Sequence, residues 1–228
     1  MDGFYGRFLD SLTPEHQAQA KAQMRMLRAR RGQVLLGRGA SSTDIYFIRE
    51  GAFSVVAYSP QGREVSLRTV TVGDVVGELA AVDGQARSAT VVAETDARVD
   101  ILSREDFLAL IESSPKTAMW LAQLLASKIR DMNDRIFELS ALNVQARLHC
   151  ELLRLAKGGA DANEPLVITP APTHERLANR IGTHREAVTR ELGVLKQNKV
   201  IVTRRGALEV VDLRRLEHFV GQAVGDLL

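Results

Sequence analysis

The feature that most constrains the fold of this 228-residue chain is a pair of short amphipathic helix patterns joined at Gly182. Apolar residues recur at helical spacing on both sides of that glycine, which gives each predicted helix one stripe to bury. The stripes consist of Leu177, Ala178 and Ile181 before the glycine, and of Ala187, Val188, Leu192 and Leu195 after it. Two such helices with a short glycine-containing turn between them are typical of a helix-turn-helix.

The second predicted helix begins with polar and charged side chains that its apolar stripe leaves exposed. These are Thr183, His184, Arg185, Glu186, Thr189 and Arg190. Arginine can donate two hydrogen bonds to guanine, glutamate can accept one from cytosine, and the start of a recognition helix is where such side chains reach base edges. The pattern therefore predicts that the chain reads DNA sequence, although an ordinary helical hairpin with a solvated charged face has the same periodicity.

A predicted β-hairpin follows and favours the DNA-binding interpretation. The β-rich runs Val200–Val202 and Ala207–Val211 flank a basic, glycine-containing turn. A basic hairpin behind a recognition helix is typical of a winged helix-turn-helix, and it places Arg204 and Arg205 where they can meet phosphate. The net charge of the whole chain is only +2, so the positive charge that attracts DNA has to be concentrated in this C-terminal region.

Composition argues against several other classes of protein. No apolar run approaches the ~18 residues that span a membrane. The N-terminus lacks a signal-peptide core, so a cytoplasmic location is expected. Cys150 is the single cysteine and is expected to be a buried structural thiol, and no histidine lies between residues 17 and 148, so no metal is expected. An enzyme such as a phosphodiesterase needs clustered metal ligands or a nucleophile with its base, and the sequence has no such pattern.

The N-terminal half of the chain predicts a β domain. Thr13 and Pro14 have the pattern of an N-cap and first helical residue, which predicts a short helix ending near residue 22. From Met24 to Leu102 short β-rich runs alternate with glycine-containing turns, as in an antiparallel sandwich or barrel. The predicted strands include Asp44–Arg49, Phe53–Tyr58, Glu64–Val70, Thr90–Ala93 and Ala97–Leu102.

A long helix is predicted after this domain. Ser103 has the pattern of an N-cap for a short helix, and Pro115 then opens a helix that meets no breaker until about Ser140. Its apolar residues are spaced alternately by three and four: Ala122, Leu125, Ile129, Met132, Ile136 and Leu139. This heptad seam predicts a dimer interface, and a helix buried in a bundle core is the alternative.

The remaining segments complete an α+β fold with three expected domains, 1–114, 115–142 and 143–228. Asn143 is the expected N-cap of a helix over Val144–Lys157, and the break at 140–143 is the expected hinge. Further expectations are a polar loop at 158–165, a strand at Val167–Ile168, and a final helix through Leu213, Leu216 and Phe219.

A second group of polar residues lies within the predicted β domain. Gly77, Glu78 and Leu79 are expected to close a turn and begin a short helix, whose free N–H groups suit an anion. Arg87 follows Glu78 by nine residues and can bind phosphate through two bonds, and Ser88 can add a hydroxyl bond. With a carboxylate for a ribose hydroxyl, this set suits a cyclic nucleotide, and a simple Glu–Arg surface pair is the alternative.

These features together resemble the cyclic-AMP receptor protein/fumarate-nitrate regulator (CRP/FNR) family of bacterial transcription factors. The resemblance covers about residues 15–212, in the family order of β-roll, dimerisation helix and winged helix-turn-helix. Asp44–Gly51 resembles the β-roll pattern, and Gly77–Leu79 followed by Arg87–Ala89 resembles the family's phosphate-binding cassette. The resemblance implies a jelly-roll-like antiparallel β-roll that binds a cyclic nucleotide.

The resemblance also implies roles for individual residues at the nucleotide site. Glu78 takes the ribose 2′-hydroxyl, while Arg87 and Ser88 take the cyclic phosphate. Met132 and Asn133 occupy the positions that contact the purine, where they depart from the threonine–serine pair of the cyclic-AMP-binding branch. This departure leaves the base open. Cyclic AMP stays the first expectation, and cyclic GMP is the alternative because an asparagine side chain can pair with either base.

On the DNA side the resemblance implies a half-site close to TGTGA. Arg185 and Arg190 are expected on guanines and Glu186 on a cytosine. Phosphate contacts are expected from Thr173, Thr183 and Thr189, and His184 is expected to be a phosphate contact or a bystander and not a base reader. The implied partners are double-stranded DNA, a second copy of the chain and RNA polymerase, with no membrane. The alternative is a family member that responds to haem or another small molecule, or that is constitutively active.

Overall fold

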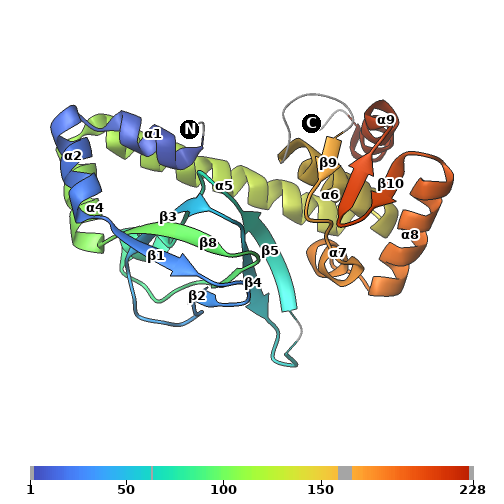
Figure 1. Ribbon diagram of the computed structural model, residues 1–228, viewed down its shortest axis with the longest axis horizontal. Helices are drawn as coiled ribbons and strands as arrows, with labels where there is room; N and C mark the ends of the chain where they lie inside the picture. Colours follow the sequence, from blue (N-terminus) through green and yellow to red (C-terminus); the bar gives the residue numbers. More distant parts are fainter. Residues whose placement is uncertain (1–2, 63, 159–165, 226–228) are drawn as a thin grey trace. The chain divides into compact units, whose positions relative to one another are not determined.

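The computed structural model describes residues 3–62, 64–158 and 166–225. The chain divides into two compact units, residues 1–130 and 131–228, and each is described by itself. The first unit is rich in strands and the second in helices, and the long helix α5 (Pro115–Ala141) contains the division between them (Figure 1). Within the described residues, no helix is both long enough and apolar enough to cross a membrane.

The first unit is built on two antiparallel sheets, each with four strands among the described residues. In the first sheet the order is β1–β8–β3–β6, formed by Arg25–Ala29, Ala97–Leu102, Ile45–Glu50 and Val75–Val76. In the second sheet the order is β2–β7–β4–β5, formed by Val34–Leu36, Thr90–Ala93, Phe53–Tyr58 and Glu64–Val70. The predicted antiparallel β domain is confirmed, and all five predicted strands are present, with β3 one residue later than expected.

The two faces of the first sheet take part in different cores because strand residues alternate between faces. On β3, Ile48 belongs to a cluster that also contains Phe53 and Val91 of the second sheet, so this cluster joins the two sheets. Phe47, the residue before Ile48, belongs instead to a cluster with Phe8 and other helical residues. The alternation of β3 therefore joins the first sheet to the second sheet on one face and to helices on the other.

The helices of the first unit are α1 (Phe4–Ser11), α2 (Pro14–Gln23), α3 (Glu78–Asp83) and α4 (Arg104–Ser113). The predicted N-caps Thr13 and Ser103 are confirmed, since each hydroxyl accepts a hydrogen bond from the N–H three residues on. The sequence analysis did not predict α1. The ring of Phe8 on this helix stacks on the ring of Phe47 on β3, with centroids 4.9 Å apart. The contact that buries Phe8 therefore joins segments about 40 residues apart in the chain.

The predicted long helix is confirmed by α5, which runs from Pro115 to Ala141. The seam residues Ile129, Met132 and Ile136 are 58%, 63% and 60% exposed. The alternative of a helix buried in a bundle core is therefore wrong for these residues, because they are not covered within this chain.

The second unit combines helices with a small sheet. The helices are α6 (Val144–Gly158), α7 (His174–Ile181), α8 (Arg185–Gln197) and α9 (Leu213–Val224), and the sheet order is β10 (Ile201–Arg204), β11 (Ala207–Val210) and β9 (Leu166–Ile168). Asn143 caps α6, accepting from the Ala146 N–H at 2.9 Å, as predicted. Cys150 is buried against α9, as expected of a structural thiol, and burial raises its pKa to about 11. The predicted loop at 158–165 lies outside the described residues from residue 159 on.

A buried network of charges connects the end of α5 with α6 and α7. The carboxylate of Glu151 on α6 accepts from Arg180 of α7 at 2.9 Å, from Arg154 at 2.5 Å and from Arg135 of α5 at 3.3 Å. Glu138 binds Arg135 and Arg154, and Arg135 also donates to the carbonyl oxygen of Arg180. Glu151 and Arg180 are both buried, so their charges have to be compensated inside the protein by the ion pairs of this network.

Replacing Glu151 should therefore destabilise the second unit strongly. We expect Glu151→Ala to lower the free energy of unfolding by about 3–5 kcal/mol, because Arg180, Arg135 and Arg154 would all lose a buried carboxylate partner. The control is Glu217→Ala, which removes an exposed pair with Lys157 at 2.9 Å and should cost no more than about 1 kcal/mol. Urea unfolding of the full chain measures both, and equal losses would contradict the prediction.

Candidate functional site

The candidate nucleotide site begins where β6 ends and α3 starts, at Gly77. Its φ of +85° is in the left-handed region, and a Cβ there would lie 2.7 Å from Nη1 of Arg87 and 2.8 Å from the Asp44 carbonyl oxygen. Glycine is thus required both by the backbone conformation and by the close approach of Arg87. The next residue, Glu78, is the first residue of α3 and its side chain is buried.

Arg87 is buried and partly bonded within the protein. Its guanidinium donates to the carbonyl oxygens of Gly77 at 3.0 Å and Asp44 at 2.7 Å, and to the Ser42 hydroxyl at 3.1 Å. A guanidinium has five N–H groups; three of them make these bonds, and Tyr46 also interacts with the guanidinium. Burial lowers the pKa of Arg87, and the nearby Tyr46, Asp44 and Glu78 oppose that shift.

Glu78 and Arg87 therefore lie beside each other, as the sequence analysis expected. Gly77 connects the two residues: its carbonyl oxygen accepts a hydrogen bond from Arg87, and Glu78 is the next residue in the chain. Both side chains are buried rather than solvated. The alternative of a simple surface Glu–Arg pair does not describe this geometry, because Glu78 is ion-paired elsewhere.

That partner is Lys128 on α5, which the sequence analysis missed. Its Nζ lies 2.6 Å from Oε1 of Glu78 and donates to the Val75 carbonyl oxygen at 3.1 Å. Burial lowers the pKa of Lys128 to about 8, against the opposing effect of Glu78. No local pattern marks this lysine, because its partner is 50 residues earlier in the chain.

The other predicted nucleotide contacts are more exposed. Leu79 and Ser88 face solvent within the first unit. Met132 and Asn133 are exposed on α5 in the second unit. Among the described residues, no group of three or more His, Cys, Asp or Glu side chains is arranged to hold a metal ion.

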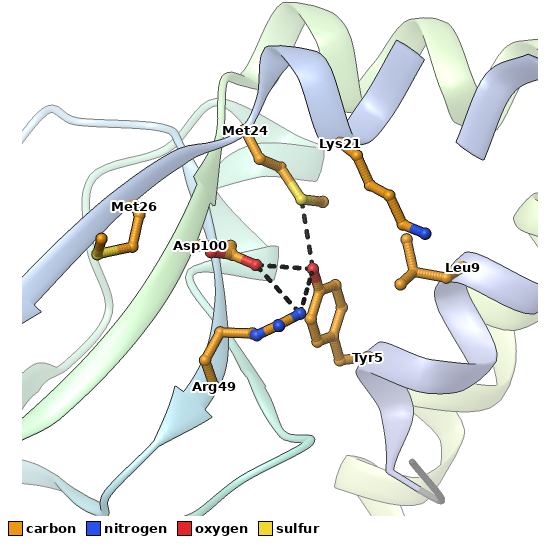
Figure 2. Close-up of a pocket in the computed structure, with 7 residues that line it drawn as sticks. All are labelled: Tyr5, Leu9, Lys21, Met24, Met26, Arg49 and Asp100. Carbon is orange, nitrogen blue, oxygen red and sulfur yellow. Dashed lines mark hydrogen bonds and ion pairs between the residues drawn. The ribbon is translucent and has the colours of Figure 1, made fainter. Parts of the chain in front are cut away.

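A separate pocket of about 370 Å³ lies beside α1 in the first unit (Figure 2). At its centre the Tyr5 hydroxyl donates to Asp100 at 2.7 Å, and Arg49 lies 3.5 Å from the same carboxylate. Burial, followed by Asp100, raises the pKa of Tyr5 to about 12. The polar groups bond to one another across the pocket and fasten α1 to the first sheet, and none of the predicted nucleotide contacts lines it.

The candidate DNA-binding face lies on α8. Arg185, Glu186 and Arg190 are exposed near its start, while its apolar stripe is buried in the core of the second unit. The predicted turn is present at Gly182, which has φ +64° and lies between α7 and α8. A Cβ on Gly182 would lie 3.2 Å from Leu139 of α5, so the turn packs closely on the end of that helix.

The predicted phosphate contacts differ in their burial and in the hydrogen bonds that they make within the protein. Thr173 is the N-cap of α7 and accepts from the Arg176 N–H at 3.2 Å, Thr183 is half-buried, and His184 occupies the N-cap position of α8. Thr189 donates to the Arg185 carbonyl oxygen at 2.9 Å.

The two arginines of the predicted wing also differ. Arg204 on β10 is paired with Glu209 on β11, and this pairing raises its pKa. Arg205 lies at the exposed turn between the two strands. The sequence analysis treated the two as equivalent, but the cross-strand glutamate compensates the charge of Arg204.

Comparison with known proteins agrees with both halves of this arrangement. Residues 26–114 match the cyclic nucleotide-binding domain, and residues 146–219 match the Crp-like helix-turn-helix domain. The chain is 31% identical over 206 residues to the cyclic AMP receptor protein of Thermus thermophilus, and the match covers 90% of this chain and 93% of that protein.

Solved structures show the same fold. A CRP/FNR-family transcriptional regulator from Thermus thermophilus is 27% identical with a TM-score of 0.72, over 87% of this chain and all (100%) of that one. The c-di-GMP-responsive global regulator CLP of Xanthomonas campestris, 20% identical, has a TM-score of 0.71 over 91% and 98% of the two chains. Sequence and structure together show that the chain belongs to the CRP/FNR family, as a DNA-binding transcription regulator with a cyclic nucleotide-binding domain.

Proposed function

We propose that this chain is a homodimeric transcription regulator that a cyclic nucleotide, first of all cyclic AMP, switches into its DNA-binding form. The observation that carries this proposal is that buried Glu78 follows Gly77 in the chain while buried Arg87 donates to the Gly77 carbonyl oxygen. A cyclic nucleotide presents a single phosphate charge and a ribose hydroxyl close together. The guanidinium of Arg87, held in place by its internal bonds, suits the phosphate, and the carboxylate of Glu78 suits the hydroxyl.

Lys128 supplies the connection between this site and α5. In the free protein its ammonium group is ion-paired with the carboxylate of Glu78. A ribose hydroxyl that binds Glu78 therefore has to share this carboxylate with Lys128 or displace Lys128 from it. A ligand shifts a conformational equilibrium only through different affinities for the two states. We propose that the strength of the Glu78–Lys128 pair differs between the free and bound states and that α5 passes this difference on.

The choice of nucleotide rests on the relatives and on α5. The Thermus thermophilus relative is a cyclic AMP receptor protein, which favours cyclic AMP here. Asn133 offers both a donor and an acceptor to a purine, so cyclic GMP is the alternative. Calorimetric titration with each nucleotide separates the two.

We predict that Arg87→Leu abolishes binding of cyclic AMP in that titration, because the phosphate loses a bidentate cationic partner. Arg49→Leu is the matched control, since Arg49 is a bonded arginine of the same unit that lines the pocket of Figure 2. Its affinity should equal that of the wild type. The reverse result, with binding lost in Arg49→Leu and kept in Arg87→Leu, would move the nucleotide to the Figure 2 pocket.

We further propose that the exposed seam of α5 pairs with the seam of a second copy. Four large apolar side chains of this seam are exposed among the described residues: Ile129, Met132, Ile136 and Leu139. A stripe of this kind at heptad spacing is typical of a two-helix interface. A twofold dimer presents two recognition helices about one turn of DNA apart, which suits a palindrome of two half-sites.

Ile129→Asp should weaken dimerisation at least tenfold, because the two carboxylates would be buried in an apolar interface. Gln123→Asp on the same helix adds the same charge at an exposed position outside the seam and should leave the dimer intact. Analytical ultracentrifugation reports both. A dimer that withstands Ile129→Asp would show that the seam is not the interface.

On DNA, we propose that Arg185, Glu186 and Arg190 read a half-site close to TGTGA, with Arg205 and the threonines around α7 and α8 near phosphate. RNA polymerase at the regulated promoter is then the further partner. These assignments depend on the exposure of the three side chains at the start of α8, where base edges are reached in a helix-turn-helix.

Arg190→Ala should cost about 1–3 kcal/mol of binding free energy at one guanine position and relax specificity there. Arg205→Ala should instead weaken binding to all sequences alike and lower the salt dependence by about one counterion. Fluorescence anisotropy with duplexes changed at single positions measures both. Uniform weakening by Arg190→Ala would make it a phosphate contact.

A further inference from the structure

A hydrogen bond outside the predicted site connects α7 to the recognition helix α8. Nδ1 of His174, the first residue of α7, lies 2.7 Å from Oγ1 of Thr189. The Thr189 hydroxyl has one hydrogen, and it donates that hydrogen to the Arg185 carbonyl oxygen at 2.9 Å. His174 is therefore the donor in its bond to Thr189, and its proton is on Nδ1.

This tautomer determines where a second proton can bind. A neutral imidazole carries one N–H, so with Nδ1 protonated the lone pair is on Nε2. The charged groups of α8 that act on the ring are Lys196 and Arg185, both cations. Burial, followed by these two residues, lowers the pKa of His174, which favours the neutral ring in the free protein.

The ring also lies at the face of α8 that carries the candidate base readers. Its direct partner Thr189 and the adjoining Arg185 are exposed on that face, as is Arg190. DNA bound there brings phosphates close to the ring. A phosphate has the opposite effect to Lys196 and Arg185, because a nearby anion favours the charged form of histidine.

We infer that His174 binds a DNA phosphate as an imidazolium, with Nδ1–H on Thr189 and a proton taken from solvent on Nε2. DNA binding by this chain then takes up one proton at each recognition helix. The inference rests on the proposed DNA-binding role of α8. Because binding takes up protons, DNA affinity decreases as the pH rises and increases as the pH is lowered.

The test is DNA affinity measured by fluorescence anisotropy between pH 5.5 and 8.0, with saturating cyclic AMP and a duplex of two TGTGA half-sites. Wild-type affinity should increase about tenfold or more from pH 8 to pH 6, since one proton per site gives up to tenfold per pH unit. His174→Asn should show a much smaller slope. Its amide N–H can replace Nδ1–H in the bond to Thr189, but asparagine takes up no proton.

Two other histidines of the second unit need separate variants. His184 is exposed beside Arg185, and His149 is buried with Nε2 3.2 Å from Glu191 on α8. His184→Asn and His149→Gln should both keep the wild-type slope. If the slope disappears in either of these and persists in His174→Asn, the inference is wrong. An unchanged melting temperature and cyclic AMP affinity verify that His174→Asn is folded.

The remaining outcomes separate this inference from the function it rests on. Wild-type binding that does not change with pH, or a His174→Asn slope equal to that of the wild type, overturns the inference and leaves the DNA-binding role intact. Wild-type protein that binds no duplex at any pH overturns the proposed function, and the inference with it.

Discussion

The coupling proposed between the candidate nucleotide site and the long helix α5 depends on one buried ion pair, between Glu78 and Lys128. Two charges taken out of water are costly unless each compensates the other, and here burial is strong enough to lower the pKa of Lys128 to about 8. Under the proposed function, a ligand that competes for Glu78 would act directly on α5, and the pair would couple the occupancy of the site to this helix.

The same helix takes part in a second charge cluster near its C-terminal end. Arg135 on α5 binds Glu138 and Glu151, and it donates to the carbonyl of Arg180 in the last turn of α7. The turn at Gly182 packs against Leu139 of α5. Within the second unit the end of α5 is thus bonded to the helix-turn-helix itself, so α5 contributes a cation to each unit.

Much of the fold could be predicted because its signals are local. Thr13, Ser103 and Asn143 each cap a helix by accepting from the N–H three residues on, so their roles can be predicted from residues within one helical turn. Alternation along the strands and the stripes of α7 and α8 are equally short-range. Helix α1 was missed because its Phe8 packs against Phe47, a residue about 40 positions away in the chain.

The candidate site divides in the same way. The sequence alone determined the residue types: a Gly-Glu turn, an arginine nine residues later, an apolar seam at heptad spacing, and an Arg-Glu start to a recognition helix. Only the tertiary structure decided their partners. It placed Lys128 on Glu78, Glu209 on Arg204 and His174 on Thr189. Periodicity and capping act between residues within a turn of each other, whereas these pairings arise only when packing brings separate elements together.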